Sequence, residues 1–229
     1  FRSVGVWAFA LLLAACAGGP PAPDWQVEAH GALERSIRAG LRGDARVAAS
    51  EFARARAQTA STGRPDWVAR VELVRCAVQV ASLDVGPCAG FEPLRTDAPP
   101  AERAYEAYLA GRIAAEQIAL LPAGQRAVAQ ALTARAGDTV AASLDPALLR
   151  RIEDPFSRLV AAGVVAQAGR ANAAVAEIAV ETASNEGWRR PLLAWLEVQR
   201  RAAEAAGDTA AASALARRIA LVTGEARRP

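Results

Sequence analysis

The sequence predicts an all-α fold in which antiparallel helix pairs stack as a short α-solenoid, with one loop pinned by a disulfide. Three observations support this fold class. Ala, Leu, Arg, Glu and Gln, which favour helices, dominate the composition. No run of alternating β-branched residues indicates a strand. Gly, Pro and Asp recur at intervals that suit short helices joined by tight turns.

The first three helices follow from these breakers. Asp24 can cap a helix that runs to about Leu41, and Gly43-Asp44 makes the turn into a second helix that ends near Ser61. After Pro65, a third helix carries two neighbouring apolar stripes at helical spacing, which predicts a central, broadly buried helix. The stripes are Trp67, Val71, Val74 and Val78, and Ala69, Leu73, Cys76, Val80 and Leu83.

The middle of the chain is less regular. A loop rich in Pro and Gly is expected over residues 85–100. Loops of this length often carry function, although a pinned surface loop would also fit. A helix over 100–121, with Tyr105, Leu109 and Ile113 facing inward, and a helix over 123–136 after Pro122 are expected next.

Helix starts are clearest in the last third of the sequence. Asp145-Pro146 and Asp154-Pro155 each combine an N-cap residue with Pro at the first helical position. Gly169-Arg170 turns into a helix that ends near residues 185–187. A final pair is expected over 188–206 and 208–222, with its turn at Gly207-Asp208.

Three of the turns are followed by a similar spacing of small and larger residues. The sets are Gly43, Asp44, Ala48, Phe52 and Ala55; Gly169, Arg170, Ala174, Ile178 and Glu181; and Gly207, Asp208, Ala212, Ala216 and Ile219. The last two turns lie 38 positions apart, near the period of two-helix repeats. This pattern resembles tetratricopeptide repeats over about half of the chain, although that family's Trp, Leu-Gly and Tyr positions are mostly missing. A non-repetitive helical bundle is the alternative.

The N-terminal segment ends in Leu13-Ala14-Ala15-Cys16 after an apolar run too short to span a bilayer. It resembles the lipobox of a bacterial lipoprotein signal peptide. The resemblance implies a signal peptide over 1–15, lipidation of Cys16 with palmitate-type chains, and a tether over 16–23. Ala17 in place of Asp implies the periplasmic face of the outer membrane. An ordinary secretory peptide is the alternative. One helical domain over 24–224 and a disordered tail over 225–229 would follow.

Lipidation of Cys16 leaves Cys76 and Cys88 as a pair in an oxidising compartment. Cys76 lies about two turns before the expected helix end near Asp84, and the loop from Val85 can run back over that distance. We therefore expect a Cys76–Cys88 disulfide, with two separate buried thiols as the alternative. A redox site is disfavoured because there is no C-x-x-C spacing.

No constellation of catalytic residues is evident, so the chain is not expected to be an enzyme or to hold a cofactor or metal. His30 is the only histidine, and no phosphate-binding loop is evident. Glu102, Glu106 and Glu116 are interpreted as a solvated helix face with Arg103 and Arg112. The net charge is only +3 and Lys is absent, so the sequence does not indicate the strongly basic surface that binds nucleic acid.

The expected function is a lipid-anchored protein–protein interaction or assembly module of the cell envelope. Its partners would be the membrane, through Cys16, and an envelope protein or peptide. In the tetratricopeptide resemblance, the first helix of the last pair would offer Glu197, Arg201 and Glu204 to a partner. Trp188 and Trp195 pack in the core or anchor a partner. The alternative is a periplasmic protein that binds a glycan or small molecule, or processes cell wall, with a pocket between helices.

Overall fold

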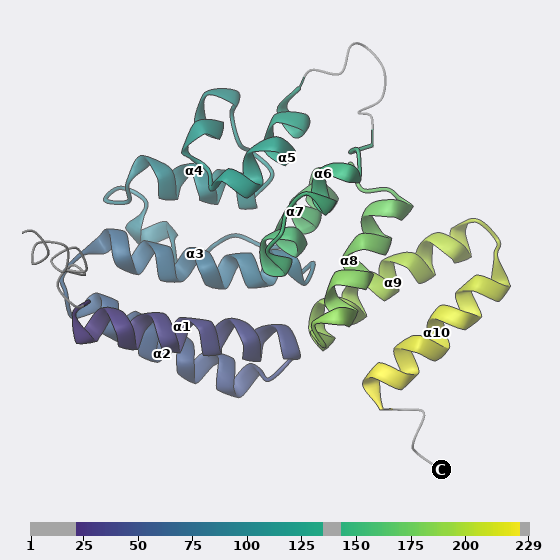
Figure 1. The fold of residues 1–229 in the computed structure, drawn as a ribbon, viewed down its shortest axis with the longest axis horizontal. Coiled ribbons are helices and arrows are strands. Elements are labelled where there is room, and N and C mark those ends of the chain that lie inside the picture. Colours follow the sequence, from purple (N-terminus) through teal and green to yellow (C-terminus); the bar gives the residue numbers. More distant parts are fainter. Residues whose placement is uncertain (1–21, 135–142, 225–229) are drawn as a thin grey trace, which may run out of the picture.

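The computed structural model describes residues 22–134 and 143–224, and these residues form helices and turns with no β-strand among them (Figure 1). The predicted all-α fold with helix-pair packing is confirmed for this part of the chain. The predicted signal peptide, Cys16, most of the tether, the 225–229 tail and the end of the 123–136 helix lie outside the described residues.

Residues 22–134 contain five α-helices and two 3₁₀ segments. In order these are α1 (Asp24–Arg42), α2 (Ala45–Ala60), α3 (Pro65–Ala81), η1 (Glu92–Leu94), α4 (Pro100–Leu109), η2 (Ala115–Leu120) and α5 (Ala123–Thr133). After the gap come α6 (Ala147–Arg150), α7 (Pro155–Gln167), α8 (Ala173–Asn185), α9 (Arg189–Ala205) and α10 (Thr209–Thr223).

Short turns join successive helices into antiparallel pairs. Gly43, Gly169 and Gly207 have φ values of 90°, 68° and 73°, the left-handed conformation that glycine adopts most readily. Asp154 caps α7 and Asp208 caps α10, each accepting a backbone N–H three residues on. The N-cap predicted at Asp154 is therefore confirmed. At the other predicted Asp-Pro start, Pro146 is the N-cap residue, and the side chain of Asp145 accepts from the N–H of Ala147. Helix α1 begins at Asp24 itself, without a side-chain cap.

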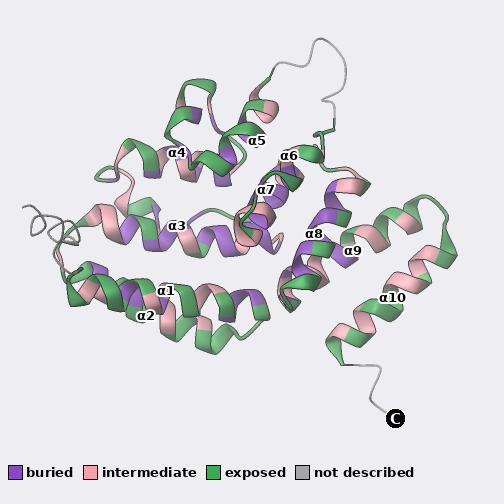
Figure 2. Cartoon of the chain, viewed as in Figure 1, coloured by how far each residue is buried: buried purple, intermediate pink, exposed green. Residues whose placement is uncertain are grey.

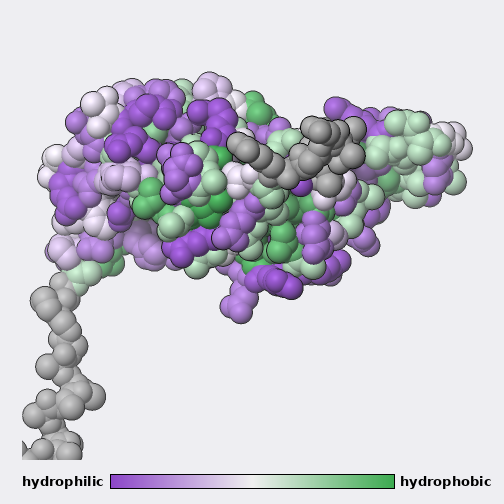
Figure 3. Space-filling model, turned by 90° about the horizontal axis from the view of Figure 1, so that it is seen from above, coloured by the Kyte–Doolittle hydropathy of each residue, from purple (hydrophilic) through white to green (hydrophobic). Residues whose placement is uncertain are grey.

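The core lies where α3 and α7 cross, and α3 also packs against α2 and α4 (Figure 2). Val80, Ala81 and Leu159 are buried there. Towards the C-terminus, α7 packs on α8, and α8 packs on α9. The pair α9–α10 extends from this core as an arm, visible at the right of Figures 1 and 3, and α10 has no fully buried residue.

The predicted helix over 100–121 is wrong in its second half. The helix ends at Leu109, and Gly111 takes a φ of 67°. The N–H of Arg112 bonds back to the carbonyl of Ala107, which closes the helix end. The chain then resumes as the 3₁₀ segment η2, and Ile113 is buried as expected.

The 85–100 loop is packed against the helices. Cys76 and Cys88 form the expected disulfide, with a Cα–Cα distance of 5.7 Å. Phe91 is fully buried and lies in the same core cluster as both cysteines. The loop therefore covers one end of the core.

Candidate binding cleft

A cleft of about 710 Å³ opens where the α1–α2 turn, the end of α3 and the start of α9 meet. We call it the α9 cleft. Its volume is in the range of ligand and peptide sites in proteins. Because its walls come from segments more than 100 positions apart in the sequence, the tertiary fold alone creates it.

Small residues leave the space for this cleft. Because Gly40 has no side chain, α1 can approach α3 closely at this point. A Cβ on Gly40 would lie 3.0 Å from Cγ1 of Val78. Along α2, Ala45, Ala48 and Ala49 line the wall with methyl groups only. Small side chains on a helix facing other helices produce a largely apolar hollow.

Arginine supplies the polar side of the α9 cleft. Arg75 lies over the Phe52 ring, 4.6 Å from its centroid, and its Nη2 lies 3.2 Å from Oε2 of Glu72. Arg190 donates to Asp84 across 2.7 Å. Arg189 is exposed, and among the described residues no carboxylate pairs with it. The cleft therefore has an uncompensated positive charge at its rim.

The helix dipole adds to this charge. Arg189 and Arg190 occupy the first turn of α9, which has no acidic residue and no side-chain cap. Cations are unfavourable at the positive end of a helix, whereas an anion there is stabilised. Ser82, another lining residue, is 6% exposed, and its hydroxyl has no partner among the described residues. The arrangement favours an anionic group with apolar atoms beside it.

The tryptophans predicted as possible partner anchors lie in the core. Trp195 is fully buried, and its indole N–H donates to the carbonyl of Ala81 across 3.3 Å. Trp188 is 9% exposed and precedes α9 directly. Their apolar spacing fits core packing, which the sequence also allowed. Neither ring is available to a partner on this surface.

The predicted residues Glu197, Arg201 and Glu204 lie on the surface of α9, and none of them lines the α9 cleft. Arg200 joins the two glutamates, and Arg201 donates to Glu197 across 3.0 Å. Hydrogen bonding to Arg200, and then to Arg201, lowers the pKa of Glu197 to about 2 despite some opposing desolvation. These charges are satisfied within the helix.

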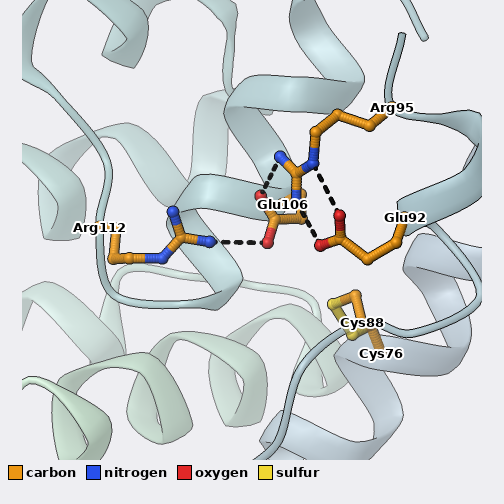
Figure 4. A network of polar contacts seen from close by, with 6 residues as sticks. All are labelled: Cys76, Cys88, Glu92, Arg95, Glu106 and Arg112. Carbon is orange, nitrogen blue, oxygen red and sulfur yellow. Dashed lines mark hydrogen bonds and ion pairs between the residues drawn. A yellow bond between two sulfur atoms is a disulfide. The ribbon is translucent and has the colours of Figure 1, made fainter. Parts of the chain in front are cut away.

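Sequence reasoning missed three buried carboxylates. Glu72, Glu102 and Glu106 are between 3% and 6% exposed, so the interpretation of Glu102 and Glu106 as a solvated face is wrong. Glu106 accepts from Arg95 on the loop, at 3.0 Å, and from Arg112, at 2.9 Å (Figure 4). Arginines from other segments compensate these charges, so burial is tolerated.

Gly90 is a partial indication, in the sequence, of the buried position of Glu72. A Cβ at this position would lie 2.5 Å from Cδ of Glu72 and 2.9 Å from Nη2 of Arg75. A glycine in a loop can mark a place where another group approaches the backbone closely. The sequence shows the glycine but does not identify the approaching group.

The described residues contain no cluster of three or more His, Cys, Asp or Glu side chains able to hold a metal. His30 lies 3.2 Å from Glu34 on an exposed face of α1. None of the helices within 22–134 and 143–224 combines the length and apolarity that a membrane span requires.

Comparison with known protein families, with characterised proteins and with solved structures gave no match.

Proposed function

We propose that this chain is a lipid-anchored interaction module of the bacterial envelope, and that it binds a partner segment in the α9 cleft. The partner segment carries a carboxylate next to apolar side chains. The observation that carries the proposal is the pairing of an apolar wall with the uncompensated charge of Arg189.

Charge complementarity favours an acidic segment over a basic one. A carboxylate near Arg189 would meet the positive end of α9 and could accept a hydrogen bond from Ser82. The methyl groups of Ala48 and Ala49 would take up the neighbouring apolar side chains. The lipobox resemblance at residues 13–16 supports attachment to the membrane, with the helical body on the periplasmic side.

Photo-crosslinking in living cells tests the binding site. A photoreactive amino acid at Ala49, which is exposed in the cleft, should give one discrete adduct with an envelope protein. The same probe at Ala210, exposed on α10, is the control position. We expect the Ala49 adduct to disappear in the Arg189→Glu variant, because the rim then repels a carboxylate.

Arg201→Glu is the matched control, since it makes the same charge change on the same helix outside the cleft. The adduct should persist in this variant. Binding in the cleft would be contradicted if the adduct were lost equally in Arg189→Glu and Arg201→Glu. It would also be contradicted if probes at Ala49 and Ala210 gave the same adduct.

Anchoring is tested separately. Cells given an alkyne analogue of palmitate should label the wild-type protein and leave Cys16→Ala unlabelled. Labelling that survives this substitution would contradict lipidation at Cys16, without bearing on the cleft.

A further inference from the structure

A second cleft, of about 450 Å³, lies between α3, α4 and the segment that joins η2 to α5. We call it the Tyr105 cleft. Leu73 and Leu121 form buried parts of its wall, and Leu120 is 43% exposed at its edge. The space is large enough for a small molecule and is separate from the α9 cleft.

One polar group in this apolar wall is incompletely satisfied. Glu102 is 6% exposed, and its Oε1 accepts from Nε of Arg70 across 2.5 Å. Its Oε2 is buried without a hydrogen-bond partner among the described residues. Leaving a buried carboxylate oxygen unpaired is unfavourable, so a donor entering the cleft gains by pairing with it.

The charges around the cleft favour an uncharged donor. Arg70 and Glu102 both line it and compensate each other. A ligand ammonium would be attracted by Glu102 and repelled by Arg70, and the reverse holds for a ligand carboxylate. A primary amide could donate to Oε2 and accept from a guanidinium N–H of Arg70, which uses only Nε toward Glu102.

Tyr105 supplies a flat aromatic wall of the cleft. It stacks on Tyr108 with ring centroids 6.2 Å apart, and this fixes one wall of the cleft. A flat apolar body could pack against that wall.

We infer that the Tyr105 cleft binds a small, uncharged, largely apolar molecule through an amide group that pairs with Glu102 and Arg70. This site is independent of the proposed partner cleft. A negative result for the Tyr105 cleft would not contradict partner binding in the α9 cleft. A negative result for the α9 cleft would not contradict ligand binding in the Tyr105 cleft.

Three probes of similar size and different polar groups test the inference: benzamide, benzoate and benzylamine. Each is titrated into the purified protein, with methyl and backbone signals followed by NMR. We expect benzamide to bind at least tenfold more tightly than the two charged probes, with contacts from its ring to the methyl groups of Leu73 and Leu121.

Ala101→Trp fills the mouth of the cleft from an exposed position on α4 and should abolish benzamide binding. Ala53→Trp, at an exposed position on α2, is the matched control and should bind normally. In Glu102→Gln, the preference for benzamide should fall at least fivefold, provided that the circular dichroism spectrum is retained.

Equal affinity for the three probes would overturn the inference. So would the lack of benzamide binding up to its solubility limit, or benzamide binding that survives Ala101→Trp. Since Ala101→Trp leaves the ion pair untouched, the test holds even if Glu102→Gln does not fold.

Discussion

Helix α7 crosses α3 at Gly163, which lies directly over the backbone of Val80. A Cβ on Gly163 would lie 2.8 Å from the carbonyl carbon of Val80, nearer still to its oxygen, and 2.9 Å from its Cγ1. The two helices that form the centre of the core can approach this closely only because residue 163 has no side chain. The position of α7 in turn fixes α8 and the start of α9, which forms one wall of the α9 cleft.

Gly163→Ala should therefore destabilise the protein by about 3 kcal/mol or more. Overpacking a core generally costs about 1–3 kcal/mol. Here the added methyl group would clash with a backbone carbonyl, which cannot change rotamer as a side chain can. The free energy of unfolding from urea denaturation measures this loss. Gly124→Ala on α5 is the control, because its Cβ would make an ordinary contact of 3.7 Å with Ile152. Equal stability of the two variants would contradict the close crossing.

Removing the Cys76–Cys88 disulfide should lower stability by about 3 kcal/mol. The bridge closes a short loop and so limits the conformational freedom of the unfolded chain. The double variant Cys76→Ala/Cys88→Ala should melt at a lower temperature than the oxidised wild type in differential scanning calorimetry. Dithiothreitol should lower the melting temperature of the wild type and leave that of the double variant unchanged. A wild type insensitive to reductant would count against the bridge.

Local chemistry allowed the helices to be predicted, and long-range packing limited the prediction of the sites. Asp154 and Gly207 act on residues within one turn of themselves, so the sequence indicates the start and end of their helices. Gly111 also acts locally, but Ala-rich sequence on both sides masked its turn. In contrast, Glu102 is buried because Arg70, 32 positions away, compensates its charge. No periodicity along α4 contains that information.

The α9 cleft shows the same limit more strongly. Its lining joins Gly40 of α1 to Arg189 of α9. Of the two tryptophans that were candidates for binding, Trp195 instead donates a hydrogen bond from α9 to the last residue of α3. Glycines inside helices, such as Gly163, are the one sequence signal that could have indicated a close crossing. They mark where helices meet without identifying the partner helix.

Glu106→Gln should cost about 2 kcal/mol. The amide keeps the size of the side chain but removes the charge shared by Arg95 and Arg112. Breaking a buried ion pair can cost about 3–5 kcal/mol, and partial exposure of both arginines reduces the loss. Chemical denaturation measures it. Glu116→Gln, at an exposed position on η2, should change stability by less than about 0.5 kcal/mol. Comparable effects at both positions would contradict the burial of Glu106.

Glu197 should make the stability of the protein depend on pH in acid. Its pKa falls from 4.5 to about 2 on folding, because Arg200 and Arg201 hold the charged form. The unfolded chain therefore takes up the proton first, so the contribution of Glu197 is complete above about pH 4.5. It is lost as the pH falls to about 2. Solvent screens these charges, which keeps the effect small.

The difference in unfolding free energy between the wild type and Glu197→Gln isolates this contribution. Urea titrations between pH 6 and pH 2 should show the difference narrowing steadily as the pH falls. High salt at pH 6 should narrow it as well, since salt screens an exposed ion pair. Glu186→Gln, at an exposed position beyond the end of α8, controls for the general effect of removing a carboxylate. A difference for Glu197→Gln that stays constant down to pH 2 would show that the arginines do not stabilise its charge.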